Sequence, residues 1–350
     1  MITSEITRSA IRTLVAGQDL DHETARNAMH EILTAQANEI QIAAFLIALR
    51  MKGETIDEIT ACAEVLRELA DHLTPGFDVM DIVGTGGDGQ HTMNISTTAA
   101  FVLATAGVPV AKHGNRSVSS KCGAADVLEA MGLNINVPPH IALQWLKEYN
   151  FCFLFAQKYH PSLKPVGVVR NVLGIRTLFN VLGPLANPAG ATLQLMGVYA
   201  KELVEPMAKV LSNLGVKRGM VVYGLDGLDE ATLCDGTFLC EVCPDGSTAA
   251  RTIYPEEFGL TRCSLDKIRG EDAKVNAGIV RALLSGKETG PRQEIVALNA
   301  GLGLYIAGKT ASIQDGIDLA LEILNSGKAD VLVEEMIQVT RKFERSYDFE

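Results

Sequence analysis

The sequence has no excess of positive charge and no long hydrophobic segment. Its 350 residues include 31 Lys and Arg against 42 Asp and Glu, a formal net charge of −11, which argues against a protein that coats nucleic acid by general electrostatic attraction. No apolar stretch approaches the roughly 20 residues that a membrane-spanning helix needs. The opening residues MITSEITRSA also lack a basic segment that leads into an apolar one. We therefore expect a cytoplasmic protein that binds neither membranes nor nucleic acid.

Cysteine is present, but not in the pattern of a disulfide framework or a zinc site. Seven cysteines, an odd number, are spread over the chain, which favours reduced thiols. Cys240 and Cys243 form one CxxC motif, yet no second CxxC and no nearby histidine completes a set of four zinc ligands. The pair lies in the alternating run TFLCEVCPDGS, so we expect strand packing in a hairpin rather than a metal.

The first seventy residues carry the pattern of successive helices. Apolar side chains recur at helical spacing in one segment, at Ile40, Ala43, Ala44 and Ile47. Gly17 and Gly53 are expected stops, and Thr55 followed by Glu58 predicts a capping box at a helix N-terminus. We expect residues 1–75 to form a small all-helical domain.

After residue 76 the pattern changes to alternating strands and helices. The predicted strands cover residues 77–83, 108–111, 151–155, 193–199 and 220–223, and a predicted helix over 96–106 follows the first of them. Helical patterns return at 272–284, 295–307 and 330–343. This alternation is typical of a largely parallel sheet flanked by helices. We expect a large α/β domain over 76–160 and 189–350, and expect the helix-like segment 161–188 to complete the helical domain.

A glycine-rich loop follows the first predicted strand. Residues 84–89, GTGGDG, satisfy the G-x-G-x-x-G pattern of dinucleotide-binding sites. Such a site expects an acidic residue about 20 positions later, where this chain has the sequence KHGNR at 112–116. Asp88 inside the loop would also repel a pyrophosphate group pressed against it. The sequence therefore argues against a nicotinamide cofactor.

Hydroxyls and cations gather near the first two predicted strands. Between Asp88 and Asp126 there is no acidic residue, whereas this interval holds Lys112, Arg116, Lys121, Ser117, Ser119 and Ser120. Glycine amides, hydroxyls and a few cations after successive strands suit a multiply charged phosphate compound bound at helix N-termini. The alternative is an ordinary solvated turn, which rarely holds so many glycines and hydroxyls.

Two adjacent carboxylates follow a later predicted strand, in the loop DGLDE at 226–230. Magnesium prefers one or two carboxylates together with phosphate oxygens of the substrate. Asp229 and Glu230 therefore predict a magnesium site that faces the phosphate pocket. Taken alone, an Asp-Glu pair more often lies on a solvated surface. The phosphate-binding pattern upstream favours the magnesium site.

Five segments together resemble the anthranilate phosphoribosyltransferase family. They are GTGGD at 84–88, NIST at 94–97, KHGNRSVSS at 112–120, the run YHPSLKPVGVVRNVLGIRTLFNVLGPLANP at 159–188, and DGLDE at 226–230. The resemblance covers nearly the whole chain. It implies the nucleoside phosphorylase/phosphoribosyltransferase fold, a homodimer built through the small helical domain, and a magnesium-dependent pentosyltransferase of the second step of tryptophan biosynthesis. The expected substrates are anthranilate and 5-phosphoribosyl 1-pyrophosphate (PRPP).

The resemblance also implies roles for individual residues. For PRPP they are Gly84, Gly87, Asp88, Thr92, Asn94, Ile95, Ser96, Thr97, Lys112, His113, Gly114, Asn115, Arg116, Ser117, Val118, Ser119, Ser120 and Ala124. For anthranilate they are Gly84, Asn115, His160 and Arg170, and for magnesium Ser96, Asp229 and Glu230. Many family members have a hydroxyl residue at the position of Ala124, so one pyrophosphate contact is expected to be missing here.

The resemblance implies no certain catalytic residue, because an uncharged aromatic amine is nucleophilic without a strong base. His113 is the candidate general base, and a structural hydrogen-bonding role is the alternative. Two other functions stay open. One is a pyrimidine nucleoside phosphorylase, which shares the fold. The other is a non-catalytic homologue that binds nucleic acid.

Overall fold

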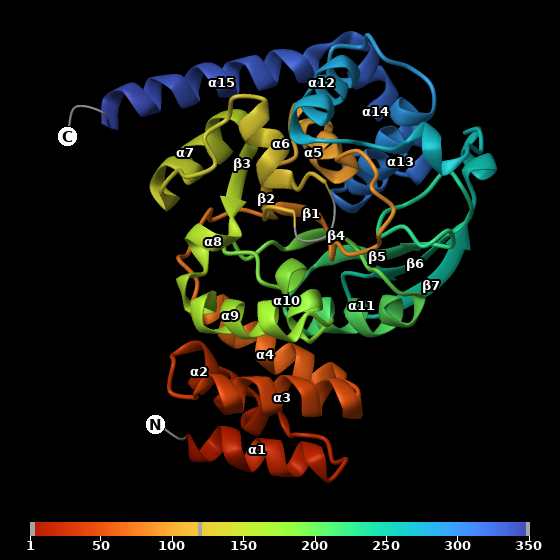
Figure 1. The fold of residues 1–350 in the computed structure, drawn as a ribbon. Coiled ribbons are helices and arrows are strands. Elements are labelled where there is room, and N and C mark those ends of the chain that lie inside the picture. The colour runs from red at the N-terminus through yellow and green to blue at the C-terminus, as the bar shows by residue number, and fades with distance from the viewer. Residues whose placement is uncertain (1–3, 118–120, 348–350) are drawn as a thin grey trace.

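A seven-stranded sheet lies between two helical layers (Figure 1). The computed structural model describes residues 4–117 and 121–347. The strands are β1 (Met80–Gly84), β2 (Val110–Gly114), β3 (Phe151–Phe155), β4 (Leu193–Gly197), β5 (Arg218–Gly224), β6 (Thr237–Val242) and β7 (Thr248–Ile253). Their order in the sheet is β3-β2-β1-β4-β5-β6-β7. The first five are parallel, and β6 and β7 add an antiparallel hairpin to one edge.

The predicted strands are present, with shifted ends. The strand over 151–155 is confirmed as β3, whereas β1 begins at Met80 rather than at residue 77. Strand β2 continues beyond 111 because its pairing with β3 persists to Gly114 and Phe155. Lys112 and His113, which follow the strand predicted over 108–111, therefore lie within β2. Cys240 is buried in β6, which confirms its packing in a strand.

The four N-terminal helices begin at residues that satisfy their free backbone amides. The helices are α1 (Glu5–Val15), α2 (His22–Leu33), α3 (Glu39–Lys52) and α4 (Ile56–Glu68). Their N-cap side chains, on Ser4, Asp21, Asn38 and Thr55, each accept a hydrogen bond from a first-turn amide. The capping box of Thr55 and Glu58 is confirmed.

The helical spacing of Ile40, Ala43, Ala44 and Ile47 belongs to α3, which confirms the helix, but these positions are not its most buried face. Ile40 is 72% exposed, and the buried side chains include Ile42, Phe45, Leu46 and Leu49. Apolar residues occupy most of the circumference of this helix, so spacing alone does not select the face. The packing of α3 against α1 and α9 selects it instead.

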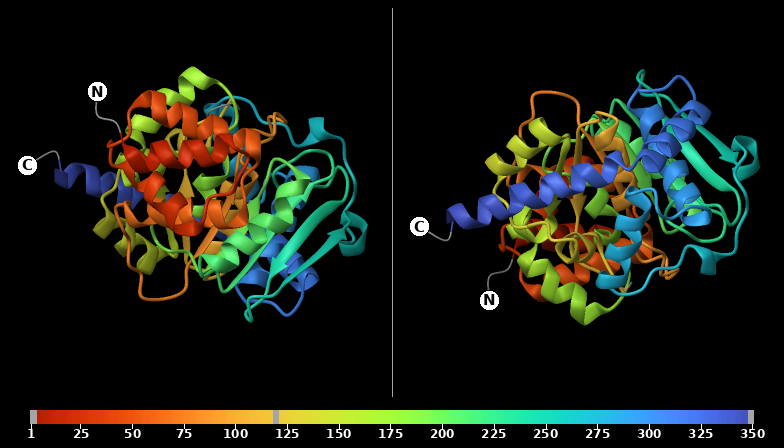
Figure 2. Two further views of the ribbon diagram at one scale, coloured as in Figure 1. Left: turned by 90° about the horizontal axis from the view of Figure 1, so that it is seen from below. Right: turned by 90° about the horizontal axis from the view of Figure 1, so that it is seen from above.

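A second helical segment joins this bundle to the sheet. It consists of α8 (Ala156–Tyr159), α9 (Lys164–Leu173) and α10 (Phe179–Leu185). Here α9 packs against α2 and α3, and α10 packs against α4. One hydrophobic cluster runs from α1–α4 through α9 and α10 to α11 (Val204–Asn213) and the adjoining face of the sheet. Seen from below, α1–α4 lie in front of the sheet, with the β6–β7 hairpin beside them (Figure 2, left).

The opposite face of the sheet is covered mainly by C-terminal helices (Figure 2, right). The helices on this side of the molecule are α5 (Ile95–Thr105), α6 (Ala124–Ala130), α7 (Pro139–Tyr149), α12 (Ala273–Leu284), α13 (Pro291–Ile306), α14 (Ile313–Ser326) and α15 (Lys328–Tyr347). The expected fold class, a small helical domain and a large α/β domain with a mostly parallel sheet, is confirmed. Its residue boundaries stay a prediction. Within the described ranges no helix is long and apolar enough to span a membrane.

Candidate functional site

The predicted functional loops meet at one edge of the sheet. Four neighbouring parallel strands, β2, β1, β4 and β5, each end in glycine, at Gly114, Gly84, Gly197 and Gly224. Because the carboxyl ends of parallel strands lie at the same edge, the loops that follow them converge there. The glycine loop follows β1, the loop beginning at Asn115 follows β2, and the acidic loop 225–236 follows β5.

The acidic loop packs directly onto the ends of two strands. A Cβ atom at Gly84 would lie 2.3 Å from Asp229 Oδ2, and one at Gly197 would lie 1.6 Å from the Asp229 carbonyl oxygen. Only glycine permits this approach. The Gly86 amide donates a hydrogen bond of 2.6 Å to Asp229 Oδ2. Asp229 thus contacts the glycine loop directly.

Three carboxyl groups crowd together at this contact. Desolvation, followed by the charges of Asp88 and Glu230, raises the pKa of Asp229 well above its usual value. Desolvation also raises the pKa of Glu230 to about 7, although Lys112 and a hydrogen bond with Ser96 oppose that shift. A cation bound beside these carboxyl groups would oppose both shifts and favour the ionised carboxylates.

The oxygen donors at this contact suit a hard cation that is also coordinated by groups outside the protein. In the part of the chain that the structure describes, no group of three or more His, Cys, Asp or Glu side chains is placed to hold a metal ion. Ser96, Asp229 and Glu230 supply oxygen donors, which magnesium prefers. Magnesium at this position would complete its coordination with phosphate oxygens or water.

Lys112 lies buried between the sheet and the first turn of α5. Its ammonium group donates hydrogen bonds to the Ile82 carbonyl oxygen, at 2.6 Å, and to Ser96 Oγ, at 3.4 Å. Desolvation lowers the pKa of Lys112, whereas Asp81 and Glu230 raise it. This cation therefore links β1, β2 and α5 beside the acidic pair.

The N-terminal turn of α5 holds the NIST segment. Asn94 is the N-cap residue, and its side chain donates to the Cys122 carbonyl oxygen and accepts from Asn276 Nδ2. The first turn of α5 carries no acidic residue, which suits a helix N-terminus that meets an anion. Ile95 and Thr97 are buried beneath this turn, and Thr92 forms an isolated bridge with Arg269.

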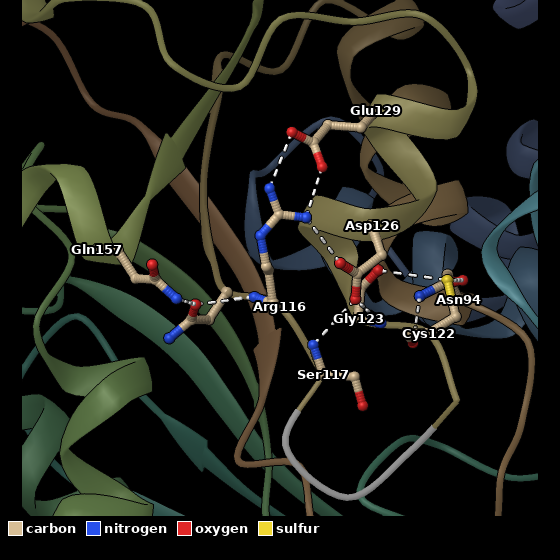
Figure 3. Close-up of polar contacts among 9 residues, drawn as sticks. Asn94, Arg116, Ser117, Cys122, Gly123, Asp126, Glu129 and Gln157 are labelled. Carbon is tan, nitrogen blue, oxygen red and sulfur yellow. Dashed lines mark hydrogen bonds and ion pairs between the residues drawn. The ribbon is translucent and has the colours of Figure 1, made fainter. Parts of the chain in front are cut away.

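The loop after β2 carries its own charge compensation (Figure 3). Arg116 makes a bidentate ion pair with Glu129, at 2.5 and 2.9 Å, and a third contact with Asp126 Oδ1, at 3.0 Å. Asp126 Oδ2 accepts hydrogen bonds from the Ser117 and Gly123 amides. The expected island of free positive charge is therefore neutralised at Arg116, by acidic residues of α6.

The other predicted residues of this loop are placed as follows. Asn115 Oδ1 accepts from the Arg116 amide, at 2.8 Å, and from Gln157 Nε2, at 3.4 Å. Gly114 ends β2, and Ala124 begins α6. Val118, Ser119 and Ser120 lie outside the described residues.

Two buried histidines face each other below this edge of the sheet. The rings of His113 and His160 are 5.1 Å apart, in an edge-to-face arrangement. Desolvation lowers the pKa of His113 to about 3 and that of His160 to about 4, so both rings are neutral at pH 7. His113 Nδ1 donates to the Gly183 carbonyl oxygen at 3.1 Å. A ring with so low a pKa is a poor base, which favours a hydrogen-bonding role for His113.

Arg170 and Arg176 come from the 159–188 segment. Arg170 on α9 is partly buried, its guanidinium lies 5.6 Å from the centre of the Phe179 ring, and desolvation lowers its pKa. Arg176 was not singled out by the sequence analysis. Its guanidinium stacks on Tyr199 and donates a hydrogen bond to the Gly87 carbonyl oxygen. In the sequence, the one indication of a role for Arg176 was its position within the segment 159–188 that carries the family resemblance.

Comparison with known proteins covers nearly all of the chain. Residues 8–70 match the helical bundle domain of a glycosyl transferase family, and residues 76–330 match the a/b domain of that family. The anthranilate phosphoribosyltransferase of Methanobrevibacter smithii is 51% identical over 333 residues, which are 95% of this chain and 99% of the relative.

Solved structures of similar proteins extend the match to three dimensions. The anthranilate phosphoribosyltransferase of Thermus thermophilus is 43% identical with a TM-score of 0.90, covering 95% of this chain and 99% of its own. The enzyme from Saccharomyces cerevisiae, solved in complex with PRPP and Mg, is 28% identical with a TM-score of 0.88, covering 97% and 99%.

Proposed function

The chain belongs to the anthranilate phosphoribosyltransferase family, and from this premise we propose that it transfers the 5-phosphoribosyl group of PRPP to the amino group of anthranilate. The products are N-(5-phosphoribosyl)anthranilate and pyrophosphate, in the second step of tryptophan biosynthesis. The observation that carries the proposal is the direct packing of Asp229 onto the glycine loop beside Lys112 and the first turn of α5. This arrangement offers a phosphate cradle and an acidic cation site at one sheet edge.

PRPP occupies the space between the glycine loop and the loop after β2. Its charged groups meet the backbone amides of the glycine loop and of the first turn of α5, the Ser96 hydroxyl and the positive charge of Lys112. Arg116 keeps its ion pairs with Glu129 and Asp126, so its contribution is to fix the loop after β2 rather than to neutralise phosphate.

Magnesium would be held by Ser96, Asp229 and Glu230. When bound, the ion supplies charge stabilisation for the departing pyrophosphate. The raised pKa values of the two carboxyl groups support this assignment, because their crowded negative charge has no full compensation from Lys112. Asp229 also keeps the glycine loop in register through the Gly86 amide.

Anthranilate lies near Arg170, Asn115, His160 and Gly84. The Arg170 guanidinium engages the substrate carboxylate, while neutral His160 and Asn115 border the ring and amine. The amine attacks ribose C1 as pyrophosphate leaves. Positioning and electrostatic stabilisation provide the acceleration, and the transition state has oxocarbenium character, by analogy with glycoside chemistry. No covalent intermediate is required.

A homodimer through the helical domain completes the proposal. Ile40 and Met51 on α3 and Val172 on α9 expose 72%, 83% and 83% of their surface. Helices α3 and α9 pack against each other, and large apolar side chains exposed on neighbouring helices support an interface between copies.

The test is product identification. The purified protein is incubated with PRPP, anthranilate and magnesium, and the mixture is separated by chromatography with mass detection. The proposal predicts equimolar phosphoribosylanthranilate and pyrophosphate. Thymidine with phosphate serves as the parallel reaction, and conversion of thymidine without any of the anthranilate product would favour a nucleoside phosphorylase instead.

A further inference from the structure

Two cysteines from distant parts of the sequence meet beside the acidic loop. The Cys263 amide donates a hydrogen bond of 3.2 Å to the Leu233 carbonyl oxygen, which holds the backbone at residue 263 against that at 233–234. The side chains of Cys234 and Cys263 are near enough for each to influence the pKa of the other. Both residues are partly exposed.

Each cysteine belongs to a segment that borders the candidate site. Cys234 lies within the acidic loop 225–236, which also carries Asp229 and Glu230. The chain after Cys263 pairs with the segment between the glycine loop and α5. The Met93 amide donates to the Ile268 carbonyl oxygen at 3.0 Å, and the Gly270 amide donates to the His91 carbonyl oxygen at 3.0 Å. The two thiols therefore join the acidic loop to the strand-like segment that supports Thr92 and the start of α5.

We propose that Cys234 and Cys263 form a reversible disulfide with each other by exchange with low-molecular-weight disulfides such as oxidised glutathione. This disulfide lowers the activity of the protein. One cysteine thiolate attacks a glutathione sulfur and releases the first glutathione as its thiolate. The second cysteine then attacks the protein sulfur of the mixed disulfide and releases the second glutathione. Two electrons and the two thiol protons pass to glutathione, so that two protein thiols and one glutathione disulfide give one protein disulfide and two glutathione thiols.

The effect on activity follows from geometry. A covalent sulfur–sulfur bond is much shorter than a thiol–thiol contact, so oxidation draws the acidic loop and the 263–270 segment together. Asp229 and Glu230 lie only a few residues before Cys234. A displacement of reacting or binding groups by about 1 Å costs an enzyme roughly 10²-fold in rate, and a fraction of that shift lowers the rate severalfold.

The reaction also has an expected pH dependence. Desolvation raises the pKa of Cys234 to about 12 and also raises that of Cys263. The attacking species is the thiolate, so disulfide formation is slow at neutral pH. The rate of disulfide formation rises about tenfold for each pH unit, as expected for a thiol at a pH far below its pKa.

The experiment maps the disulfide in the full chain. Reduced protein is incubated overnight with excess oxidised glutathione at pH 9, where more of the thiolate is present, and is then blocked with an alkylating reagent and cleaved with trypsin. Cys234 then lies in the peptide 219–251 and Cys263 in the peptide 263–267. We expect these two peptides to be joined in the unmodified sequence and in Cys243→Ser, the matched control that removes a cysteine from the same large peptide. The joined peptides should be absent in Cys234→Ser and in Cys263→Ser.

Activity is measured on the same samples. We expect at least a fivefold loss after oxidation in the unmodified sequence and in Cys243→Ser, full recovery with dithiothreitol, and no loss in Cys263→Ser. Free thiols throughout, a cross-link through Cys243, a lasting glutathione adduct, or a Cys234–Cys263 disulfide without loss of activity would each overturn the inference. The activity arm rests on the proposed function. The peptide map does not, so an inactive reduced protein would count against the proposed function alone.

Discussion

Arg170 is suited to a substrate carboxylate because its own charge has no carboxylate partner among residues 4–117 and 121–347. We expect Arg170→Gln to raise the KM for anthranilate by about 10-fold to 100-fold, as the loss of a charged hydrogen bond implies. The KM for PRPP should change little. Steady-state kinetics with each substrate varied in turn check this, with Lys164→Gln, an exposed change on the same helix, as the control. Equal increases for both substrates would mean that Arg170 acts on folding or closure instead.

His113 makes stability depend on pH in a predictable direction. Its pKa is about 3 in the folded protein, against an ordinary value of 6.5, so between these values the unfolded chain binds more protons and stability falls as the pH falls. When the pH falls from 7 to 5, we expect the free energy of unfolding of His113→Asn to fall by about 2 kcal/mol less than that of the unmodified sequence. Urea unfolding at the two pH values measures the difference. A relative stability that does not change with pH would contradict the buried, neutral ring.

At the scale of elements, the ends of the strands determine where the acidic loop sits. A methyl group at Gly197 would overlap the Asp229 carbonyl oxygen at 1.6 Å, so Gly197→Ala must displace the loop. We expect a loss of roughly 10²-fold in kcat/KM, the effect of a shift of about 1 Å.

Gly278→Ala is the matched control for that change. Gly278 lies on an exposed face of α12 with open space around its Cβ position. Alanine there should stabilise the helix by about 0.5–1 kcal/mol without changing kinetics. Steady-state kinetics and thermal melts of both variants provide the comparison. Normal kinetics in a folded Gly197→Ala protein would contradict the packing described for Asp229.

Element type and order could be predicted from the sequence, whereas faces and neighbours could not. The apolar run 151–155 is short and bounded, so it predicted β3 correctly. The helical spacing within residues 40–47 predicted a helix correctly, but it did not indicate which side of α3 is buried. That helix is apolar on most sides, and only its packing against α1 and α9 selects the buried one.

The same limit applies to the candidate site. The sequence predicted an acidic loop that faces the phosphate pocket. The direct contact of Asp229 with the glycine loop was not predicted, because it depends on Gly84 and Gly197 being neighbours in the sheet. The pairing of Arg116 with Glu129 depends on the docking of α6, which no local pattern encodes.

At the scale of the whole molecule, the helical bundle and the sheet share one hydrophobic cluster. We therefore expect them to unfold together. Phe45 in α3 is fully buried, and Phe45→Ala should cost about 3–5 kcal/mol. Trp145, the single tryptophan, lies in α7 on the other side of the molecule. Its fluorescence should report the whole destabilisation in urea. If Phe45→Ala lowered the urea midpoint measured by circular dichroism but left the midpoint measured by tryptophan fluorescence unchanged, the helical bundle and the α/β domain would unfold independently.

The most direct test of the account is the loss of anthranilate fluorescence when the protein is mixed with PRPP, with magnesium and again with a chelator. Magnesium-dependent transfer predicts a rapid loss with the metal and almost none with chelator. It also predicts a sharply reduced rate at limiting magnesium for Asp229→Asn and Glu230→Gln. No loss at any magnesium concentration from folded protein, or an equal loss in chelator, would contradict the account.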